Sequence, residues 1–252
     1  MNYLSMNIDT TNNTNQQSRK IAAIFAIIIE GGLVMSGIIP FALAQASNIS
    51  GVPSVYPLNS KPYGLTYGEW TAKWWQWALS IPKDTNPGAD TTGKNCALKQ
   101  SGPVWFLAGT FGGPATRTCT IPTGKAIFLS LINAQCNYLS KPNLKTAAEL
   151  LACAKSENEG ITGLDATIDG VKVQGLSNYR VQSPLFDITY IPNNVDGAPI
   201  GKTQGISDGY WVMLKPLPIG NHTIHLAGSV VNYASGALNN FANEVTYHIK
   251  VQ

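Results

Sequence analysis

Charged residues are scarce in this chain of 252 residues, and the two signs nearly balance. Asp, Glu, Lys and Arg make up 12% of the sequence and leave a net charge of only +3. The sequence has no run of Lys or Arg, whereas nucleic-acid-binding surfaces depend on such clusters. We therefore expect no nucleic-acid partner.

Motifs with a recognised chemistry are also missing. The sequence has no P-loop, no G-x-G-x-x-G and no H-E-x-x-H motif. Its four cysteines form no C-x-x-C pair, so we predict no zinc site. We predict no cofactor, with one alternative: the oxygen-bearing side chains between Asp84 and Asp90 are of the type that binds calcium, although their spacing is not that of an EF-hand.

Histidine occurs three times, and two of these residues are predicted to be neighbours. If Asn232 pairs with Phe241 in the last two strands, His225 lies opposite His248. His222 points to the other face of its strand. Two imidazoles supply too few ligands for a metal ion, so we predict a surface histidine pair and no metal.

No catalytic residues can be identified from the sequence. Gly205-Ile-Ser207-Asp-Gly209 matches G-x-S-x-G, but a nucleophile elbow needs a helix after the serine, and here a strand is predicted. We interpret the motif as a turn. The carboxylates of a glycoside hydrolase need not be close in sequence, so Glu69, Asp165 and Asp208 remain candidates by elimination.

What the sequence does contain begins with an export signal. Arg19 and Lys20 precede an apolar run from Ile21 to Leu43, and Ala42-Leu43-Ala44 is an A-x-A cleavage site. We predict that residues 1–44 are a signal peptide, with an uncleaved membrane anchor as the alternative. The protein is therefore expected outside the cell, or at the cell surface or envelope, with membrane contact only through an uncleaved leader.

The rest of the chain is predicted to be one β-rich domain. Residues 45–64 are rich in Ser, Pro, Asn and Gly and are interpreted as a linker into a single domain at 65–252. Many short alternating runs separated by turn residues favour a mainly β fold, an antiparallel β-sandwich of immunoglobulin-like or jelly-roll-like type. Strands at 104–108 and 117–121 are expected to form a hairpin, and 192–209 is expected to be a polar loop.

A tryptophan-rich helix is predicted at 66–81. Thr66 and Glu69 form a capping box at its start, and Pro82 ends it. Three tryptophans share one stripe and a fourth borders it: Trp70, Trp74, Trp77 and, at the margin, Trp75. We predict that the stripe packs against a sheet. A solvent-facing platform for sugar rings and a membrane-interface helix are the alternatives.

A second helix is predicted at 144–156, where Thr146 and Glu149 have capping-box spacing and Asn143 is a rival N-cap. The four cysteines follow the export signal, and an even number in that context predicts two disulfides. Three connectivities are open. We favour Cys96–Cys119 and Cys136–Cys153, because each then closes a short loop.

Several segments resemble an uncharacterised family of exported bacterial and archaeal proteins. They are EWTAKWWQWALSIP, GPVWFLAGTFGG followed by RTCTIPTGKAIF, and YWVMLKPLPIGNHTIHLAG. The resemblance covers most of residues 63–251 and implies export and a shared architecture. That family has no established activity, so the resemblance assigns no catalytic residue.

The sequence thus predicts an exported, non-catalytic β-sandwich protein of the cell surface or envelope, with a structural or ligand-binding role. A glycan or another envelope protein is the expected partner. Two alternatives are a secreted hydrolase acting on polysaccharide and a carbohydrate-binding module that stacks sugars on aromatic rings.

Overall fold

The computed structural model describes residues 53–232 and 239–252, so the predicted signal peptide at 1–44 lies outside the described residues. The helices are α1 (Tyr67–Leu79) and α2 (Ala147–Glu157), with 3-10 turns at Pro62–Gly64, Lys83–Thr85 and Leu176–Tyr179. The strands are β1 (Val104–Leu107), β2 (Gly113–Ile121), β3 (Ala126–Asn137), β4 (Ile161–Ile168), β5 (Val171–Lys172), β6 (Arg180–Gln182), β7 (Phe186–Tyr190), β8 (Gly201–Leu214), β9 (Gly220–Asn232) and β10 (Asn239–Val251). The predicted mainly β fold with two helices is confirmed.

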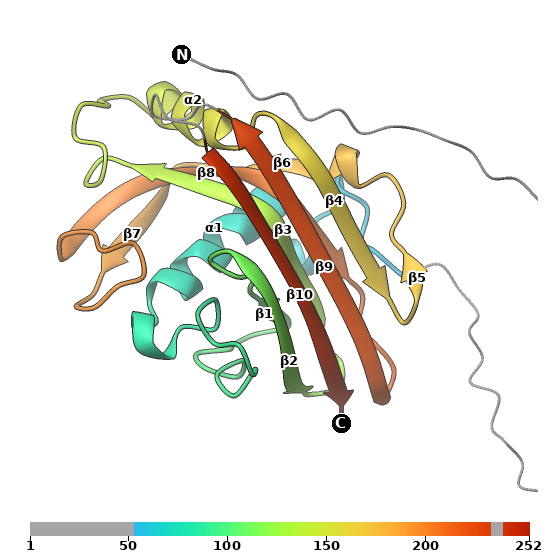
Figure 1. Ribbon diagram of the computed structural model, residues 1–252. Helices are drawn as coiled ribbons and strands as arrows, with labels where there is room; N and C mark the ends of the chain where they lie inside the picture. The colour runs from blue at the N-terminus through green and yellow to red at the C-terminus, as the bar shows by residue number, and fades with distance from the viewer. Residues whose placement is uncertain (1–52, 233–238) are drawn as a thin grey trace, which may run out of the picture. The chain divides into compact units, whose positions relative to one another are not determined.

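The strands form two five-stranded sheets stacked on each other (Figure 1). Sheet A has the order β1-β3-β8-β6, with β7 also paired to β8, and sheet B has the order β2-β10-β9-β4-β5. Most pairs are antiparallel, but β1 runs parallel to β3 and β2 runs parallel to β10. The sandwich is therefore mixed, with one parallel pair at an edge of each sheet.

The hairpin predicted between residues 104–108 and 117–121 does not form, because β1 and β2 lie in different sheets. Burial explains the separation. All four residues of β1 are buried, so β1 needs cover on both faces, which sheet A provides. In β2 only Arg117, Cys119 and Ile121 are buried, so β2 has one solvent face and suits the edge of sheet B.

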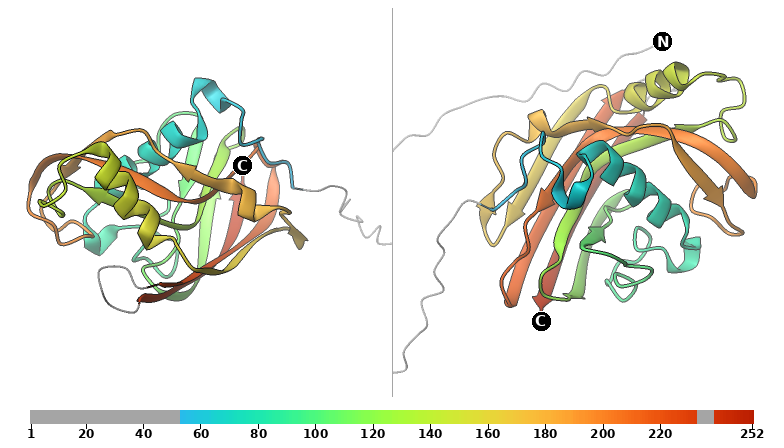
Figure 2. Two further views of the ribbon diagram at one scale, coloured as in Figure 1. Left: turned by 90° about the horizontal axis from the view of Figure 1, so that it is seen from above. Right: turned by 180° about the vertical axis from the view of Figure 1, so that it is seen from behind.

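Alternation along β3 and β8 divides the protein into three layers. Leu129 and Val212 belong to the core between the two sheets, whereas Phe128, Trp211 and Met213 belong to a second core under α1. Helix α1 thus covers the outer face of sheet A, as the view from behind shows (Figure 2). Sheet A is buried on both faces, which accounts for its nearly continuous apolar strands.

The tryptophan helix forms and packs as predicted. Thr66 and Glu69 make the reciprocal capping box. Trp70, Trp74 and Trp77 are each at most 7% exposed, and Trp75 is partly buried. The three buried indole N–H groups donate to the carbonyls of Pro62, Leu107 and Leu98 at 2.9–3.0 Å. The stripe is therefore core, and it offers no exposed row of rings.

The segment before α1 packs on sheet A, although its composition predicts a linker. Val55 bridges to Leu214, and the Tyr56 N–H donates to the Met213 carbonyl at 2.8 Å. Tyr56 and Leu58 also pack in the core under α1. The predicted boundary at residue 65 is thus too late, because the turn-rich composition of 45–64 masks a few apolar residues that dock.

Both disulfides have the connectivity that the sequence favours, Cys96–Cys119 and Cys136–Cys153. The second joins β3 to α2, whose capping box is formed by Thr146 and Glu149. Two disulfides indicate an oxidising environment. Among the described residues, no helix is long and apolar enough to cross a bilayer.

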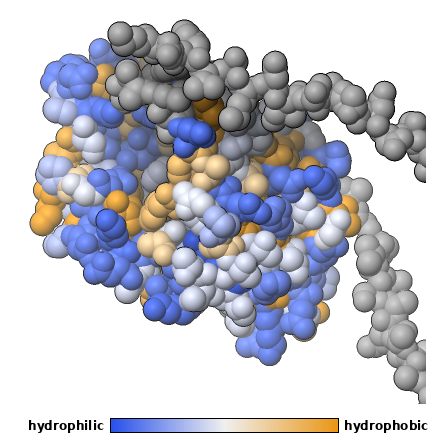
Figure 3. All heavy atoms as spheres, in the orientation of Figure 1, coloured by the Kyte–Doolittle hydropathy of each residue, from blue (hydrophilic) through white to orange (hydrophobic). Residues whose placement is uncertain are grey.

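The outer face of sheet B is turned toward the viewer in Figure 3 and shows mostly hydrophilic and neutral residues, with smaller hydrophobic areas between them. The exposure along β10 agrees with this, since Glu244, His248 and Lys250 are exposed while Val245, Tyr247 and Ile249 are buried. Sheet B therefore has one solvent face, and the candidate site lies elsewhere.

Candidate functional site

A cavity of about 100 Å³ lies beside the C-terminal half of α1. Its walls come from α1, from the loops that follow α1 and β1, from β3 and from β10. The aromatic lining residues are Trp74, Trp75, Phe111 and Phe241, the polar ones are Asn86, Thr110, Ser130, Asn133 and Asn243, and the small ones are Ala78, Gly88, Ala108 and Gly109, with Val195 completing the set. None of these described lining residues carries a charged side chain.

Three polar atoms at this cavity have no hydrogen-bond partner within the described structure. They are the indole Nε1 of Trp75 and the side-chain oxygens Oδ1 of Asn133 and Asn243. Three further buried polar atoms without a partner belong to Trp105, Asp208 and Trp211, which do not line the cavity. Since buried polar groups in proteins are almost always paired, three such residues in the lining of one cavity are consistent with a ligand or ordered water there, although Trp75 also lines a neighbouring pocket with Gln135 and Asn137.

The orientation of the Asn243 amide is fixed by its surroundings. Its Nδ2 donates to the Leu131 carbonyl at 2.7 Å, so its Oδ1 must face the other way. The register of β3 against β8 shifts between Ser130 and Ile132, and this bulge turns the Leu131 carbonyl toward β10. Gly109 lies so close that an added Cβ would be 2.9 Å from Asn243 Oδ1. The cavity therefore has one acceptor in a defined place.

Two other amide side chains border the cavity. Asn133 Nδ2 contacts the Ser130 hydroxyl, a group that both donates and accepts. Asn86 is fully used: its Nδ2 donates to the carbonyls of Ala78 and Ile81, and its Oδ1 accepts the Gly88 N–H. Asn86 thus fixes the wall to the end of α1, while Asn133 keeps hydrogen-bonding capacity for the cavity.

Arg117 lies behind the cavity wall and is 1% exposed. Its guanidinium donates to the carbonyls of Gly88, Ala108 and Gly109, which all line the cavity, and to the Asp90 carbonyl and the Tyr247 hydroxyl, at 2.6–3.2 Å. One side chain of β2 therefore ties together the two loops that form the wall. Burial raises the pKa of Tyr247, so its hydroxyl stays protonated and donates to the Ala108 carbonyl.

Asp90 shapes the neighbouring loop. Burial raises the pKa of its carboxyl, but the backbone N–H groups of Asn95 and Thr92 and the Thr92 hydroxyl outweigh that effect and hold the pKa below its ordinary value. Asp84 instead accepts a hydrogen bond from Asn193 at 2.9 Å. The two ends of this loop thus have separate protein partners, and calcium at 84–90 stays an alternative to the predicted absence of a cofactor.

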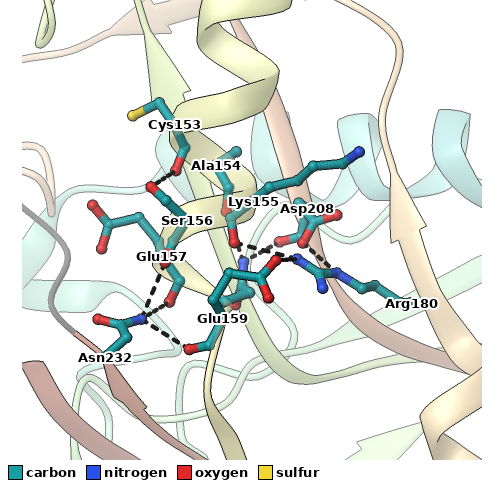
Figure 4. A network of polar contacts seen from close by, with 10 residues as sticks. Cys153, Ala154, Lys155, Ser156, Glu157, Glu159, Arg180, Asp208 and Asn232 are labelled. Carbon is teal, nitrogen blue, oxygen red and sulfur yellow. Dashed lines mark hydrogen bonds and ion pairs between the residues drawn. The ribbon is translucent and has the colours of Figure 1, made fainter.

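The three carboxylates considered for hydrolysis have separate partners. Glu69 caps α1 and Asp165 pairs with Lys172. Asp208 is fully buried, and its Oδ1 accepts from Arg180 Nε at 2.9 Å (Figure 4). Burial raises the pKa of Asp208 more than the Arg180 guanidinium lowers it, in keeping with the unpaired Oδ2.

The network around Asp208 is structural. Arg180 also contacts Glu159 and the Lys155 carbonyl, and Asn232 donates to the carbonyls of Ser156, Glu157 and Glu159 (Figure 4). These contacts join the end of α2 to β6, β8 and β9. Asp208 therefore helps to anchor α2.

The remaining sequence motifs have structural roles. Ser207 lies within β8, is fully buried and contacts the Thr71 hydroxyl at 3.2 Å, so the G-x-S-x-G match is a strand and the predicted turn is wrong. His225 lies opposite Thr246 instead of His248, because β9 and β10 pair two residues away from the predicted register. In the described ranges, no cluster of three His, Cys, Asp or Glu side chains could hold a metal ion.

Sequence reasoning located a small part of this site. Of the four helix tryptophans, Trp74 and Trp75 line the cavity, whereas Trp70 and Trp77 do not. Asn133, Asn243 and Arg117 were missed, although two of them left a signal. Asn243 and Arg117 occupy buried positions in strands whose residues alternate between buried and exposed. A polar side chain at such a position needs a hydrogen-bond partner.

No protein-family model, no curated protein sequence and no solved structure matches this chain.

Proposed function

We propose that this is an exported, non-catalytic protein that binds a small, neutral, polar ligand in the cavity beside α1. One observation carries the proposal: Trp75, Asn133 and Asn243 each have a buried polar atom without a partner, and all three residues line the same cavity. A buried polar group without a partner costs about 1–3 kcal/mol, so a site with three of them is better explained by an occupant than by packing.

The lining chemistry supports a neutral ligand. No described lining residue carries a charge that could pair with an ionic ligand. The cavity offers aromatic walls together with a few fixed polar atoms, which is the usual composition of small-molecule sites.

The same lining supports a binding role over a catalytic one. The described lining residues include no Asp, Glu, His, Cys or Lys to accept or donate a proton. The three carboxylates considered for a hydrolase are held by different partners away from this cavity. The leader and the two disulfides support export, and the surface or envelope is the location that we propose.

Ligand screening by NMR tests the proposal. The purified, disulfide-intact protein is titrated with a panel of neutral sugars, polyols and amides, and with charged analogues of each. We expect chemical-shift changes at the Trp75 indole and the Asn243 amide with one neutral class. If no member of the panel shifts these signals, the binding proposal is wrong. Release of reducing sugar from polysaccharides would favour the hydrolase instead.

A further inference from the structure

We propose that the group recognised in the cavity is an acetamido group, presented by an N-acetylated amino sugar. This inference rests on the proposed binding function and names its ligand class. It starts from the hydrogen-bonding capacity that the cavity leaves unused, which is one donor with a fixed identity and one acceptor with a fixed orientation.

The polar atoms match the two ends of an amide. An indole N–H can only donate, so Trp75 Nε1 requires an acceptor such as an amide carbonyl. Asn243 Oδ1 can only accept, because its own Nδ2 is held by Leu131, so it requires a donor such as an amide N–H. The Asn133 amide, beside the Ser130 hydroxyl, is available to either end.

The size of the cavity agrees with a group of this kind. A cavity of about 150 Å³ accepts benzene, which has six heavy atoms. The 100 Å³ found here therefore suits about four heavy atoms, and an acetamido group has four. Its methyl group would contact the apolar lining, which includes Ala78 and Ala108.

The rest of the ligand must lie outside the cavity, and the rim offers it an aromatic surface. Phe111 lines the cavity but is 59% exposed, which is unusual for a phenylalanine. The ring lies against Gly88, where an added Cβ would be 2.8 Å from Phe111 Cζ. An exposed, braced aromatic face suits the C–H face of a pyranose, and this favours an amino sugar over an extended acetylated chain.

The test compares probes that differ in one group. N-acetylglucosamine, glucose, glucosamine and Nε-acetyl-lysine are titrated into the full disulfide-intact protein, and binding is followed by NMR and by tryptophan fluorescence. We expect N-acetylglucosamine to bind at least tenfold more tightly than glucose or glucosamine, since the two lack the carbonyl and the acylated N–H.

Two variants locate the interaction. Trp75→Phe removes the unpartnered N–H and keeps an aromatic ring, so it should weaken N-acetylglucosamine binding about tenfold. Trp105→Phe is the matched control: it removes another unpartnered indole N–H that does not line the cavity, and binding should be unchanged. Phe111→Ala should weaken the binding of N-acetylglucosamine much more than the binding of Nε-acetyl-lysine.

The possible outcomes distinguish failure of the acetamido inference from failure of the proposed binding function. Tighter binding of glucose than of N-acetylglucosamine, with Trp75 still involved, would overturn the acetamido inference and leave the binding function standing. Preference for Nε-acetyl-lysine would overturn the amino sugar and point to a modified peptide. Binding that Trp75→Phe leaves intact would place the site elsewhere. Absence of binding by every neutral probe would overturn both proposals and leave a hydrated structural cavity.

Discussion

Arg117 shows how one side chain can organise the wall of a cavity. It is a buried cation whose hydrogen-bond partners among the described residues are four backbone carbonyls and one hydroxyl, with no carboxylate among them. A guanidinium presents several donors in one rigid plane, so it can satisfy carbonyls from two loops at once. Its contribution is geometric, because every loop that it holds also lines or adjoins the cavity.

Replacing Arg117 should therefore damage stability and binding together. Arg117→Met removes the donors and leaves several carbonyls buried, so we expect the free energy of unfolding to fall by about 3–5 kcal/mol. Chemical denaturation measures this. Thr118→Ala, at an exposed position of the same strand, is the control and should change little. A folded Arg117→Met protein with unchanged stability would contradict the role given to the guanidinium.

Trp74 belongs to both the core and the cavity. It packs edge-on against Trp75, Trp77 and Trp211 and donates to the Leu107 carbonyl. Trp74→Ala should lower the free energy of unfolding by about 3–5 kcal/mol, because it empties a packed site and leaves that carbonyl unpaired. Lys73→Ala, on the exposed face of the same helix, should be nearly neutral. A stable Trp74→Ala protein would show that α1 is not held by its tryptophan core.

Asp208 makes stability depend on pH in a direction that can be measured. Burial raises the pKa of its carboxyl, so the folded state binds this proton more tightly than the unfolded state does. The protonated carboxyl contributes its full stabilisation at pH values below its pKa in the unfolded state, which is about 3.9. That stabilisation is lost as the pH rises through the pKa of the folded state.

The comparison with Asp208→Asn isolates this effect. As pH rises from about 3 to 7, the wild-type protein should lose stability relative to Asp208→Asn, which cannot ionise. Urea unfolding of both proteins across that range gives the difference. A difference that stays constant, or moves in favour of the wild type as pH rises, would show that the Arg180 ion pair outweighs the burial of Asp208.

At the scale of elements, local sequence signals predicted the two helices, but the sequence did not predict how the strands pair. Both helices could be read from sequence because a capping box acts within four residues, as at Thr66–Glu69 and Thr146–Glu149. Strand pairing depends on partners far along the chain. The β9–β10 register differs from the predicted one by two residues, a shift that keeps the same faces buried and so leaves no trace in the apolar pattern.

Residues 201–209 illustrate a second limit. They were predicted to be part of a polar loop, yet they form the first nine of the 14 residues of β8. Residues 201–205 pair with β7, and 201–204 remain partly or fully exposed, so this stretch needed no apolar alternation. Residues 205–209 are buried but consist of Gly, Ile, Ser, Asp and Gly, which do not alternate either. The cavity was unpredictable for a different reason: its walls combine β3 of sheet A, β10 of sheet B and several loops, which meet only in the folded protein.

The Cys96–Cys119 disulfide connects the loop after α1 to β2, two residues from Arg117. Removing it as Cys96→Ser/Cys119→Ser should lower the free energy of unfolding by about 3 kcal/mol, since the closed loop spans 23 residues. Because this loop also carries the cavity wall, ligand binding should weaken as well. Denaturation of the double variant and of the wild type tests the first effect. Equal stabilities would mean that the loop is held without its cross-link.

At the scale of the whole molecule, the position of β10 determines when the cavity can form during folding. Strand β10 lies between β2 and β9, and it supplies Asn243 and Phe241 to the cavity. Synthesis delivers a chain from its N-terminus onward, so α1 and the strands of sheet A are available before β10 is made. Until then sheet B is divided and the Leu131 carbonyl lacks the Asn243 amide. The growing chain thus lacks a complete cavity, and the proposed binding can begin only after β10 has paired.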